Sequence, residues 1–87
     1  NPFSRRLFFY IRPDLYTFDE TVTLKLYIDD TLRFTTTLST SIRQQPLIRL
    51  PEGLMGKRWR VNFSCSGVER VELYGVQVVS LPLEVTP

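Results

Sequence analysis

The stretch that decides the fold is "TVTLKLYIDDTLRFTTTL", residues 21–38. Before its acidic pair, apolar residues occupy every second position: Val22, Leu24, Leu26 and Ile28. This period of two is typical of a strand with one buried face. After the pair, the residues expected to point inward are Leu32, Phe34, Thr36 and Leu38. Asp29-Asp30 is short and polar, and Asp tolerates left-handed backbone, so the stretch predicts a β-hairpin.

A second stretch, "LPEGLMGKRWRVNFSCSGVERVELYG" over residues 50–75, repeats these signals. Pro51-Glu52-Gly53 predicts a turn, because Pro presets φ and Gly accepts a positive φ; Gly56 allows a second reversal. In the strand that follows, the residues expected in a dry interior are Trp59, Val61, Phe63 and Cys65.

We expect Ser66-Gly67 to turn the chain into a further strand with Val71 and Leu73 inward. Antiparallel pairing around this turn would bring Arg58 and Arg60 close to Glu72 or Tyr74. Beyond them, Gly75 suggests a bulge, after which Val76 and Val78 take over the inward face.

The rest of the chain completes an all-β prediction. Residues 7–11 read as a strand, Pro13-Asp14 as a turn, residues 39–45 as a crossing loop and residues 46–50 as a short edge strand. The chain has no alanine, the best helix former, and is rich in Thr and Val. We therefore expect one domain over residues 1–87, a small antiparallel β-sandwich of six to seven strands without helices. Asn1, Pro2 and the prolines 82 and 87 suggest a fragment of a longer chain.

Composition argues against an enzyme. There is no histidine, and Cys65 is the single cysteine, so no internal disulfide forms and the thiol has no activating imidazole. Asp19-Glu20 and Asp29-Asp30 fit turns better than catalysis or calcium binding. No cofactor or metal is expected. A net charge of +2, from 11 basic and 9 acidic residues, gives no strong field for nucleic acid. No apolar run approaches the roughly 20 residues that span a bilayer.

Candidate partner contacts combine basic and aromatic side chains: Arg49, Lys57, Arg58, Arg60, Tyr27 and Tyr74. The favoured interpretation makes them the outward residues of strands. The alternatives are a protein contact, a nucleic-acid surface, or a sugar-stacking platform in which Tyr16 joins Tyr27 and Tyr74.

The 50–75 stretch resembles a segment of tail-associated structural proteins of tailed bacteriophages, of the tail hub or nozzle type. The residues that carry the resemblance are Pro51, Gly53, Gly56, Lys57, Arg58, Trp59, Ser66, Gly67, Val68, Val71 and Leu73. Residues 21–51 look similar as well, so the resemblance covers about Val22 to Tyr74. The chain departs from the pattern after Tyr74, where it reads "GVQVVSLPLEVTP".

The resemblance implies a non-enzymatic assembly module in the virion tail, packed against other virion subunits, with a homo-oligomeric ring as the expected state. Two alternatives stay open. One is a carbohydrate- or receptor-binding β-sandwich that uses surface aromatics to hold a glycan, and the other is an adhesion-type domain of a secreted bacterial protein.

Overall fold

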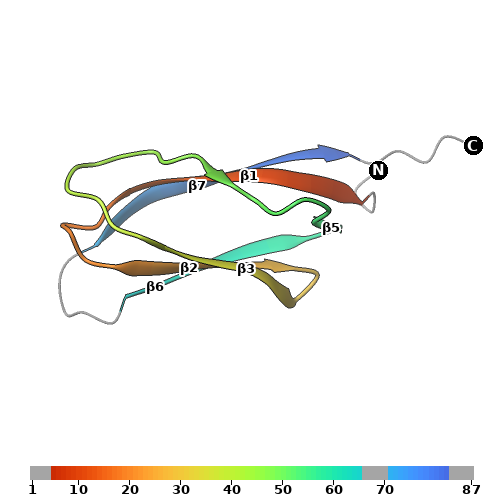
Figure 1. Ribbon diagram of the computed structural model, residues 1–87, viewed down its shortest axis with the longest axis horizontal. Coiled ribbons are helices and arrows are strands. Elements are labelled where there is room, and N and C mark those ends of the chain that lie inside the picture. Colours follow the sequence, from red (N-terminus) through yellow and green to blue (C-terminus); the bar gives the residue numbers. More distant parts are fainter. Residues whose placement is uncertain (1–4, 66–70, 83–87) are drawn as a thin grey trace, which may run out of the picture.

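The computed structural model describes residues 5–65 and 71–82, and over these residues the chain forms two antiparallel sheets that face each other (Figure 1). Sheet A contains β1 (Arg6–Tyr16), β4 (Ile48–Arg49), β5 (Met55–Gly56) and β7 (Glu72–Pro82). Sheet B contains β2 (Val22–Ile28), β3 (Thr31–Leu38) and β6 (Trp59–Cys65). The described residues contain no helix. The predicted class, a small all-β sandwich, is confirmed.

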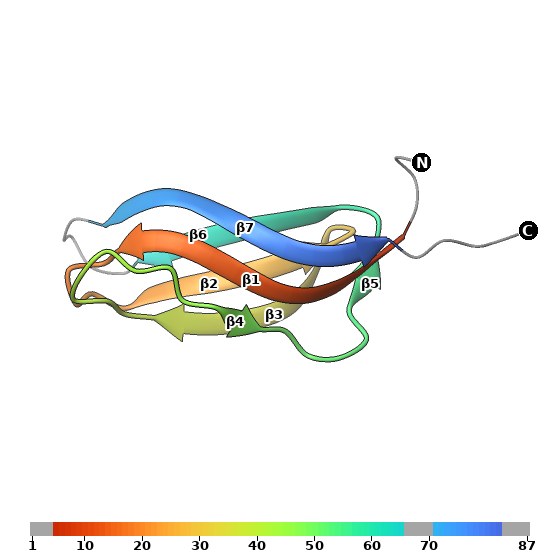
Figure 2. The same cartoon turned by 90° about the horizontal axis from the view of Figure 1, so that it is seen from above.

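Each sheet has its own central strand, β2 in sheet B and β1 in sheet A. In sheet B, β2 lies between β3 and β6. In sheet A, β1 pairs with β7 on one side and with β4 and β5 on the other, because Leu7 faces both Leu81 and Met55 across the ladders. Figure 2 shows β7 along one margin of this layer, with β1 between it and β4.

The core lies between the sheets and follows the predicted alternation. Its fully buried members are Phe8, Ile11, Leu24, Leu26, Ile28, Leu50 and Leu54. Half-buried side chains from the outer strands pack against them: Phe34, Leu38, Ile48, Val61, Phe63, Val76 and Val78. The inward positions predicted for β2 and for Val76 and Val78 are therefore confirmed.

The β2–β3 hairpin is confirmed, with one correction. Asp29 and Asp30 both have positive φ, 51° and 67°, so the two acids make the left-handed turn that was expected. Leu26 faces Phe34 but Tyr27 faces Leu32, which leaves Arg33 as the extra residue of a β-bulge. The bulge moves Leu32 to the outer face, where it is 46% exposed. The prediction that Leu32 points inward was wrong for this reason.

Strand β1 is longer than predicted, because Pro13 and Asp14 lie inside it rather than in a turn. Leu15 directs both its N–H and its C=O to Gln44, at 3.0 Å each. Pro13, two residues earlier, presents its main chain to the same side, and there residues 45–47 form no ladder with β1. A proline is tolerated in a strand where no ladder partner needs its N–H.

The predicted hairpin between residues 58–65 and 71–74 was also wrong. Strand β6 pairs with β2 in sheet B, and β7 pairs with β1 in sheet A. The chain therefore changes layers between the two strands, and Arg60 faces Tyr27 rather than Glu72 or Tyr74. The predicted turn at Ser66-Gly67 lies outside the described residues.

Trp59 does not enter the interior as predicted and is 43% exposed. It is the first residue of an edge strand, at the corner where the ladder with β2 ends, and buried Ile28 and Leu54 fill the core at this end. Val61, Phe63 and Cys65 do take the inward alternate positions, although all three are half-buried.

Leu73 is 48% exposed although it was expected inward. A bulge lies between the pairs Leu15–Leu73 and Asp14–Gly75, so Tyr74 is the extra residue. The bulge that Gly75 suggested is confirmed. Leu73 lies at the start of the marginal strand β7, where no other strand of the described residues flanks it on its second side.

The two glycines after Leu50 have different roles. Gly53 has φ of 81° in the Pro51-Glu52-Gly53 turn, as predicted. Gly56 makes no reversal; it is a buried residue of β5. A Cβ there would overlap Cγ2 of Ile28 and lie 2.8 Å from Oδ2 of Asp29, so close packing requires the glycine.

The crossing loop over residues 39–47 is attached at its start by two buried threonines. The Thr17 hydroxyl accepts the N–H of Thr40 at 2.8 Å and donates to its C=O, and the Thr40 hydroxyl accepts the N–H of Thr17. Buried polar groups are stable only when paired in this way. The pair joins the end of β1 to the loop that carries Arg43.

Candidate functional site

The structure divides the six predicted contact residues among three places. Tyr27, Lys57, Arg58 and Arg60 gather at the end of sheet B that carries the β2–β3 turn, and we name them the turn-end cluster. Arg49 lies on β4, at the edge of sheet A. Tyr74 lies on β7, near the crossing loop. The residues therefore do not form one surface.

The turn-end cluster is positioned by Asp29. The Asp29 carboxylate accepts the N–H of Lys57 at 3.1 Å and the N–H of Arg58 at 3.0 Å, and the Asp29 N–H donates to the C=O of Arg58 at 3.1 Å. These bonds attach the start of β6 to the β2–β3 turn. They leave the Lys57 and Arg58 side chains in solvent, where both residues are exposed.

Within the cluster, Arg60 covers the ring of Tyr27. Its Cζ lies 4.4 Å from the ring centroid, and the two residues face each other across the β2–β6 ladder. A cation–π contact at an exposed site contributes roughly 0.5–1 kcal/mol. Beside it is a hollow of about 140 Å³, lined by Tyr27, Asp29, Asp30, Arg58, Trp59 and Arg60. Two carboxylates and two guanidiniums line it, so it is not a purely cationic site.

Arg49 lines a hollow of about 310 Å³ between residues 7–10 of β1 and the turn at 51–53. Its guanidinium is 3.9 Å from the Glu52 carboxylate. Their side chains are 75% and 93% exposed, and such exposed ion pairs contribute little. The lining of this hollow therefore combines a charged pair with apolar residues such as Leu7, Phe8 and Phe9.

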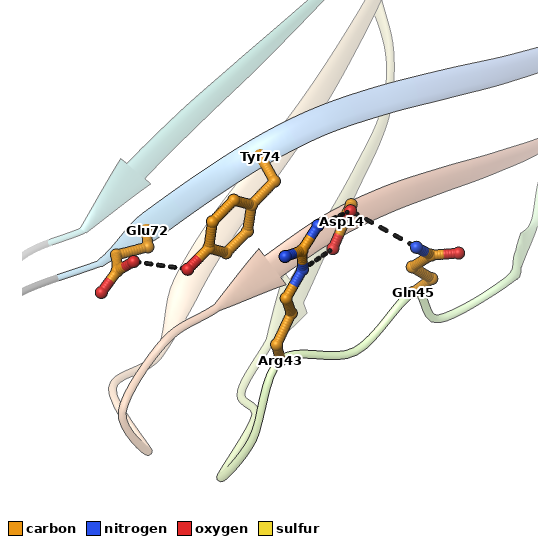
Figure 3. Close-up of polar contacts among 5 residues, drawn as sticks. All are labelled: Asp14, Arg43, Gln45, Glu72 and Tyr74. Carbon is orange, nitrogen blue, oxygen red and sulfur yellow. Dashed lines mark hydrogen bonds and ion pairs between the residues drawn. The ribbon is translucent and has the colours of Figure 1, made fainter.

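Tyr74 belongs to a polar cluster that sequence reasoning missed (Figure 3). Arg43 binds Asp14 through two nitrogens, at 3.0 and 2.9 Å, and Gln45 donates to the same carboxylate at 3.3 Å. The Arg43 Cζ lies 3.8 Å from the centroid of the Tyr74 ring. The Tyr74 hydroxyl donates to Glu72. We name these five residues the loop clamp, because they hold the crossing loop against β1 and β7.

No local signal in the sequence pointed to the loop clamp. Asp14 and Arg43 are 29 positions apart, and Asp14 had been assigned to a turn. Only the pairing of β1 with β7 brings Glu72 and Tyr74 beside Asp14. The loop clamp forms where the β1–β7 pair, the bulge at Tyr74 and the crossing loop come together. Contacts between such distant segments leave no periodic pattern in the sequence.

The clamp changes the acidity of Asp14. The hydrogen bond and the charge of Arg43, with a smaller contribution from Gln45, hold the pKa of Asp14 below its ordinary 3.8. The same contact raises the pKa of Arg43. Both effects favour the ionised pair over a broad pH range.

We expect the stabilisation from Asp14 to disappear in acid. A carboxyl whose pKa is lower in the folded state stabilises that state above its unfolded pKa, and the effect is lost as pH falls through the folded pKa. The unfolding free energies of wild type and Asp14→Asn should differ near neutral pH and converge below pH 3.8. Urea unfolding at several pH values measures this. Asp30→Asn, which removes the same charge from an exposed turn, is the control. A difference that persists unchanged in acid would contradict the assignment.

The three tyrosines of the alternative sugar-stacking platform are divided between the two sheets. Tyr16 stacks on Phe18, with ring centroids 3.7 Å apart and an interplanar angle of 19°. Tyr27 lies in sheet B, whereas Tyr16 and Tyr74 lie in sheet A. Arginine covers one face of Tyr27 and one face of Tyr74. A sugar ring would have to displace a guanidinium or use the other face.

The described residues offer no candidate metal centre. Over residues 5–65 and 71–82, no three His, Cys, Asp or Glu side chains gather closely enough to hold a metal ion. Cys65 is a half-buried free thiol that faces Val22 across the β2–β6 ladder. In the same residues there is no helix with the length and apolarity needed to cross a membrane.

Comparison with known proteins gives no further guide. No protein-family model matches the chain, and neither a curated protein nor a solved structure matches it significantly.

Proposed function

We propose that this chain is a non-enzymatic assembly module that packs against neighbouring subunits, as the resemblance to bacteriophage tail proteins implies. In that setting it is a structural domain of the virion tail, within a homo-oligomeric ring. The observation that carries the assembly role is the open edge of β7. A domain that binds a partner needs surface groups that can form hydrogen bonds with the partner. The main-chain groups along the open edge of β7 meet this requirement.

Strand β7 has one strand neighbour within the described residues, β1. It is 11 residues long, and its only charged residue is Glu72, at its beginning. Long, uncharged edge strands are templates for pairing with another chain, and monomeric proteins normally protect them. The second side of β7 therefore fits a protein partner.

The main-chain groups that face this open side can be assigned. Ile11 and Leu15 turn their N–H and C=O groups, and Pro13 its C=O, toward the side of β4 and Gln44, since Leu15 pairs with Gln44 there and alternate residues share a direction. Their partners across β7 must then turn their own groups away from β1.

The partner of Pro13 is Val76 and the partner of Ile11 is Val78. Phe8 donates its N–H toward β5, to the C=O of Leu54 at 2.9 Å. Its partner on β7, Ser80, therefore belongs to the same outward set. Within residues 5–65 and 71–82, Val76, Val78 and Ser80 thus present unpaired ladder groups at the open edge, and the alternate residues Gln77 and Val79 bond to β1.

The other edges are protected along more of their length than β7, whose own bulge at Tyr74 and charge at Glu72 both lie at its beginning. Strand β3 is interrupted by the Arg33 bulge, and β6 begins next to Arg58 and carries Arg60. The edge opposite β7 consists of two strands of two residues each, β4 and β5. Bulges, charges and short strands are the usual protections against edge pairing.

The glycan-binding alternative is less favoured by the geometry. It depends on free aromatic faces, and Arg60 and Arg43 each cover one face of the two best candidates, Tyr27 and Tyr74. The arginines would have to leave these rings before a sugar could stack on that side.

Ser80→Pro tests the proposed role, because it removes an outward N–H at the open edge without removing a main-chain hydrogen bond to β1. Ser80→Ala is the matched control: both variants lose the bond from Arg6 Nη1 to Ser80 Oγ, but only the proline loses the N–H. We expect the wild type and Ser80→Ala to associate weakly as concentration rises in sedimentation experiments, and Ser80→Pro to stay monomeric.

Equal association of the two variants would contradict a role for this edge. Specific binding on a glycan array that is abolished by Tyr27→Ala or Tyr74→Ala would favour the carbohydrate alternative instead. Circular dichroism establishes that each variant keeps its β structure before the comparison.

A further inference from the structure

We propose that the partner of the β7 edge is β7 of a second copy of this chain. The two strands pair antiparallel about a two-fold axis that passes between the two Gln77 residues. This rests on the proposed assembly function and adds the identity of the partner strand, its direction and its register. Because a two-fold contact closes on itself, it gives a dimer, and a ring built from such dimers needs a second contact elsewhere on the chain. The two copies then join their A sheets edge to edge into one continuous sheet.

The choice of partner follows from the edges that a second copy offers. A head-to-tail contact would place β7 against the opposite edge of sheet A, where β4 and β5 are two residues each and the turn at 51–53 separates them. An 11-residue strand cannot form a continuous ladder there. Strand β7 itself is the one described edge of sheet A with matching length.

Charge also permits self-pairing. In an antiparallel pair centred on Gln77, Glu72 of one copy faces Pro82 of the other, so no like charges meet on the ladder. The centre at Gln77 is also the register that gives the full 11-residue overlap, because Gln77 is the middle residue of β7.

The same register satisfies the outward main-chain groups. With Gln77 facing its own copy, Val76 of one chain faces Val78 of the other, and both carry N–H and C=O groups directed at the open edge. These pairs exchange hydrogen bonds, and the central Gln77 pair is of the non-hydrogen-bonded kind.

Side chains on both faces of β7 also gain contacts in the proposed dimer. Val76 and Val78 are half-buried and pack against the core, and the second copy would cover the exposed flank of each. On the outer face the two exposed Gln77 amides meet across the axis, where each amide can both donate and accept a hydrogen bond.

A cysteine pair tests this arrangement in the full 87-residue chain. In a Cys65→Ser background, which contains no other thiol, Gln77→Cys places one thiol per chain on the axis. Directly opposed residues of a non-hydrogen-bonded pair have Cβ atoms about 4.5–5.5 Å apart, close to disulfide distance.

Arg12→Cys in the same background is the matched control. Arg12 is exposed and faces Gln77 across the β1–β7 ladder, one strand further from the axis. In the proposed dimer the two Arg12 positions are three strand spacings apart, about 14 Å, which is too far for a disulfide.

Under mild oxidation we expect Gln77→Cys to form a disulfide dimer about tenfold faster than Arg12→Cys, and we expect Ser80→Pro to abolish this difference. Equal rates for the two cysteine variants, while Ser80→Pro still prevents association, would overturn self-pairing at Gln77 and leave the assembly role of β7 intact. A chain that stays monomeric at millimolar concentration and forms no disulfide selectively would also overturn self-pairing.

Discussion

Leu26→Ala is expected to remove most of the stability of this domain. Leu26 is fully buried on the central strand of sheet B, between Phe34 on β3 and Val61 on β6. Truncation of a buried leucine costs about 2–5 kcal/mol, because apolar contacts are lost and the cavity closes only partly. Small domains have total unfolding free energies near the lower end of about 5–15 kcal/mol. Urea unfolding followed by circular dichroism measures the loss.

Leu32→Ala is the control for this prediction. Leu32 has the same side chain on the neighbouring strand, but the Arg33 bulge leaves it 46% exposed. A substitution at such a surface position is expected to change the unfolding free energy by about 0.5 kcal/mol or less. If the two leucines proved equally costly to truncate, the bulge and the direction of Leu32 would be wrong.

Gly56→Ala is expected to produce the second large loss, about 3 kcal/mol, from overpacking. The added Cβ would overlap Cγ2 of Ile28 and crowd the Asp29 carboxylate. Asp29 would have to move, and its bonds to the N–H groups of Lys57 and Arg58 would weaken. The start of β6 would then separate from the β2–β3 turn, so the cost exceeds that of a simple steric contact.

Two other glycines show whether the loss of stability comes from steric overlap or from backbone strain. Gly53→Ala adds a Cβ in open space but at φ of 81°, so we expect a backbone cost of about 1 kcal/mol. At Gly75 an added Cβ meets no atom within 4 Å, and Gly75→Ala is expected to be neutral or slightly stabilising through the unfolded chain. Thermal unfolding of the three variants should rank them in this order. A cost at Gly75 equal to that at Gly56 would contradict the packing explanation.

The open edge of β7 connects stability with function in this protein. The residues that hold the sandwich together, such as Leu24 and Leu26, lie on the central strand of sheet B. The groups proposed to bind a partner lie on a marginal strand and are main-chain groups. Substitutions of the two kinds should therefore have different effects. Loss of core side chains unfolds the chain, whereas loss of the Ser80 N–H changes association alone.

Features with a short sequence period were predictable. The alternation from Val22 to Ile28 identified the buried face of β2, and the Asp29-Asp30 turn and the Gly53 turn followed from local backbone preferences. The same alternation misplaced Leu32, since a bulge shifts the period by one residue without a signal in the sequence.

Features that depend on distant partners were not predictable. Alternation says that residues 59–65 and 72–82 are strands, but it carries no information about which sheet each one joins. The loop clamp depends on that assignment, because β7 must lie beside β1 before Tyr74 can meet Arg43. The candidate contact residues were therefore identified by type but not by position.

By itself, then, the sequence determined that this chain is a β protein with its buried faces on alternate residues, because the pleat couples side-chain direction to position along a strand. Only the tertiary structure decided that Pro13 lies inside a strand, that β6 and β7 separate into different layers and that β7 keeps an open side. Those outcomes depend on which strands compete for the same ladder, and that competition is decided by packing across the whole domain.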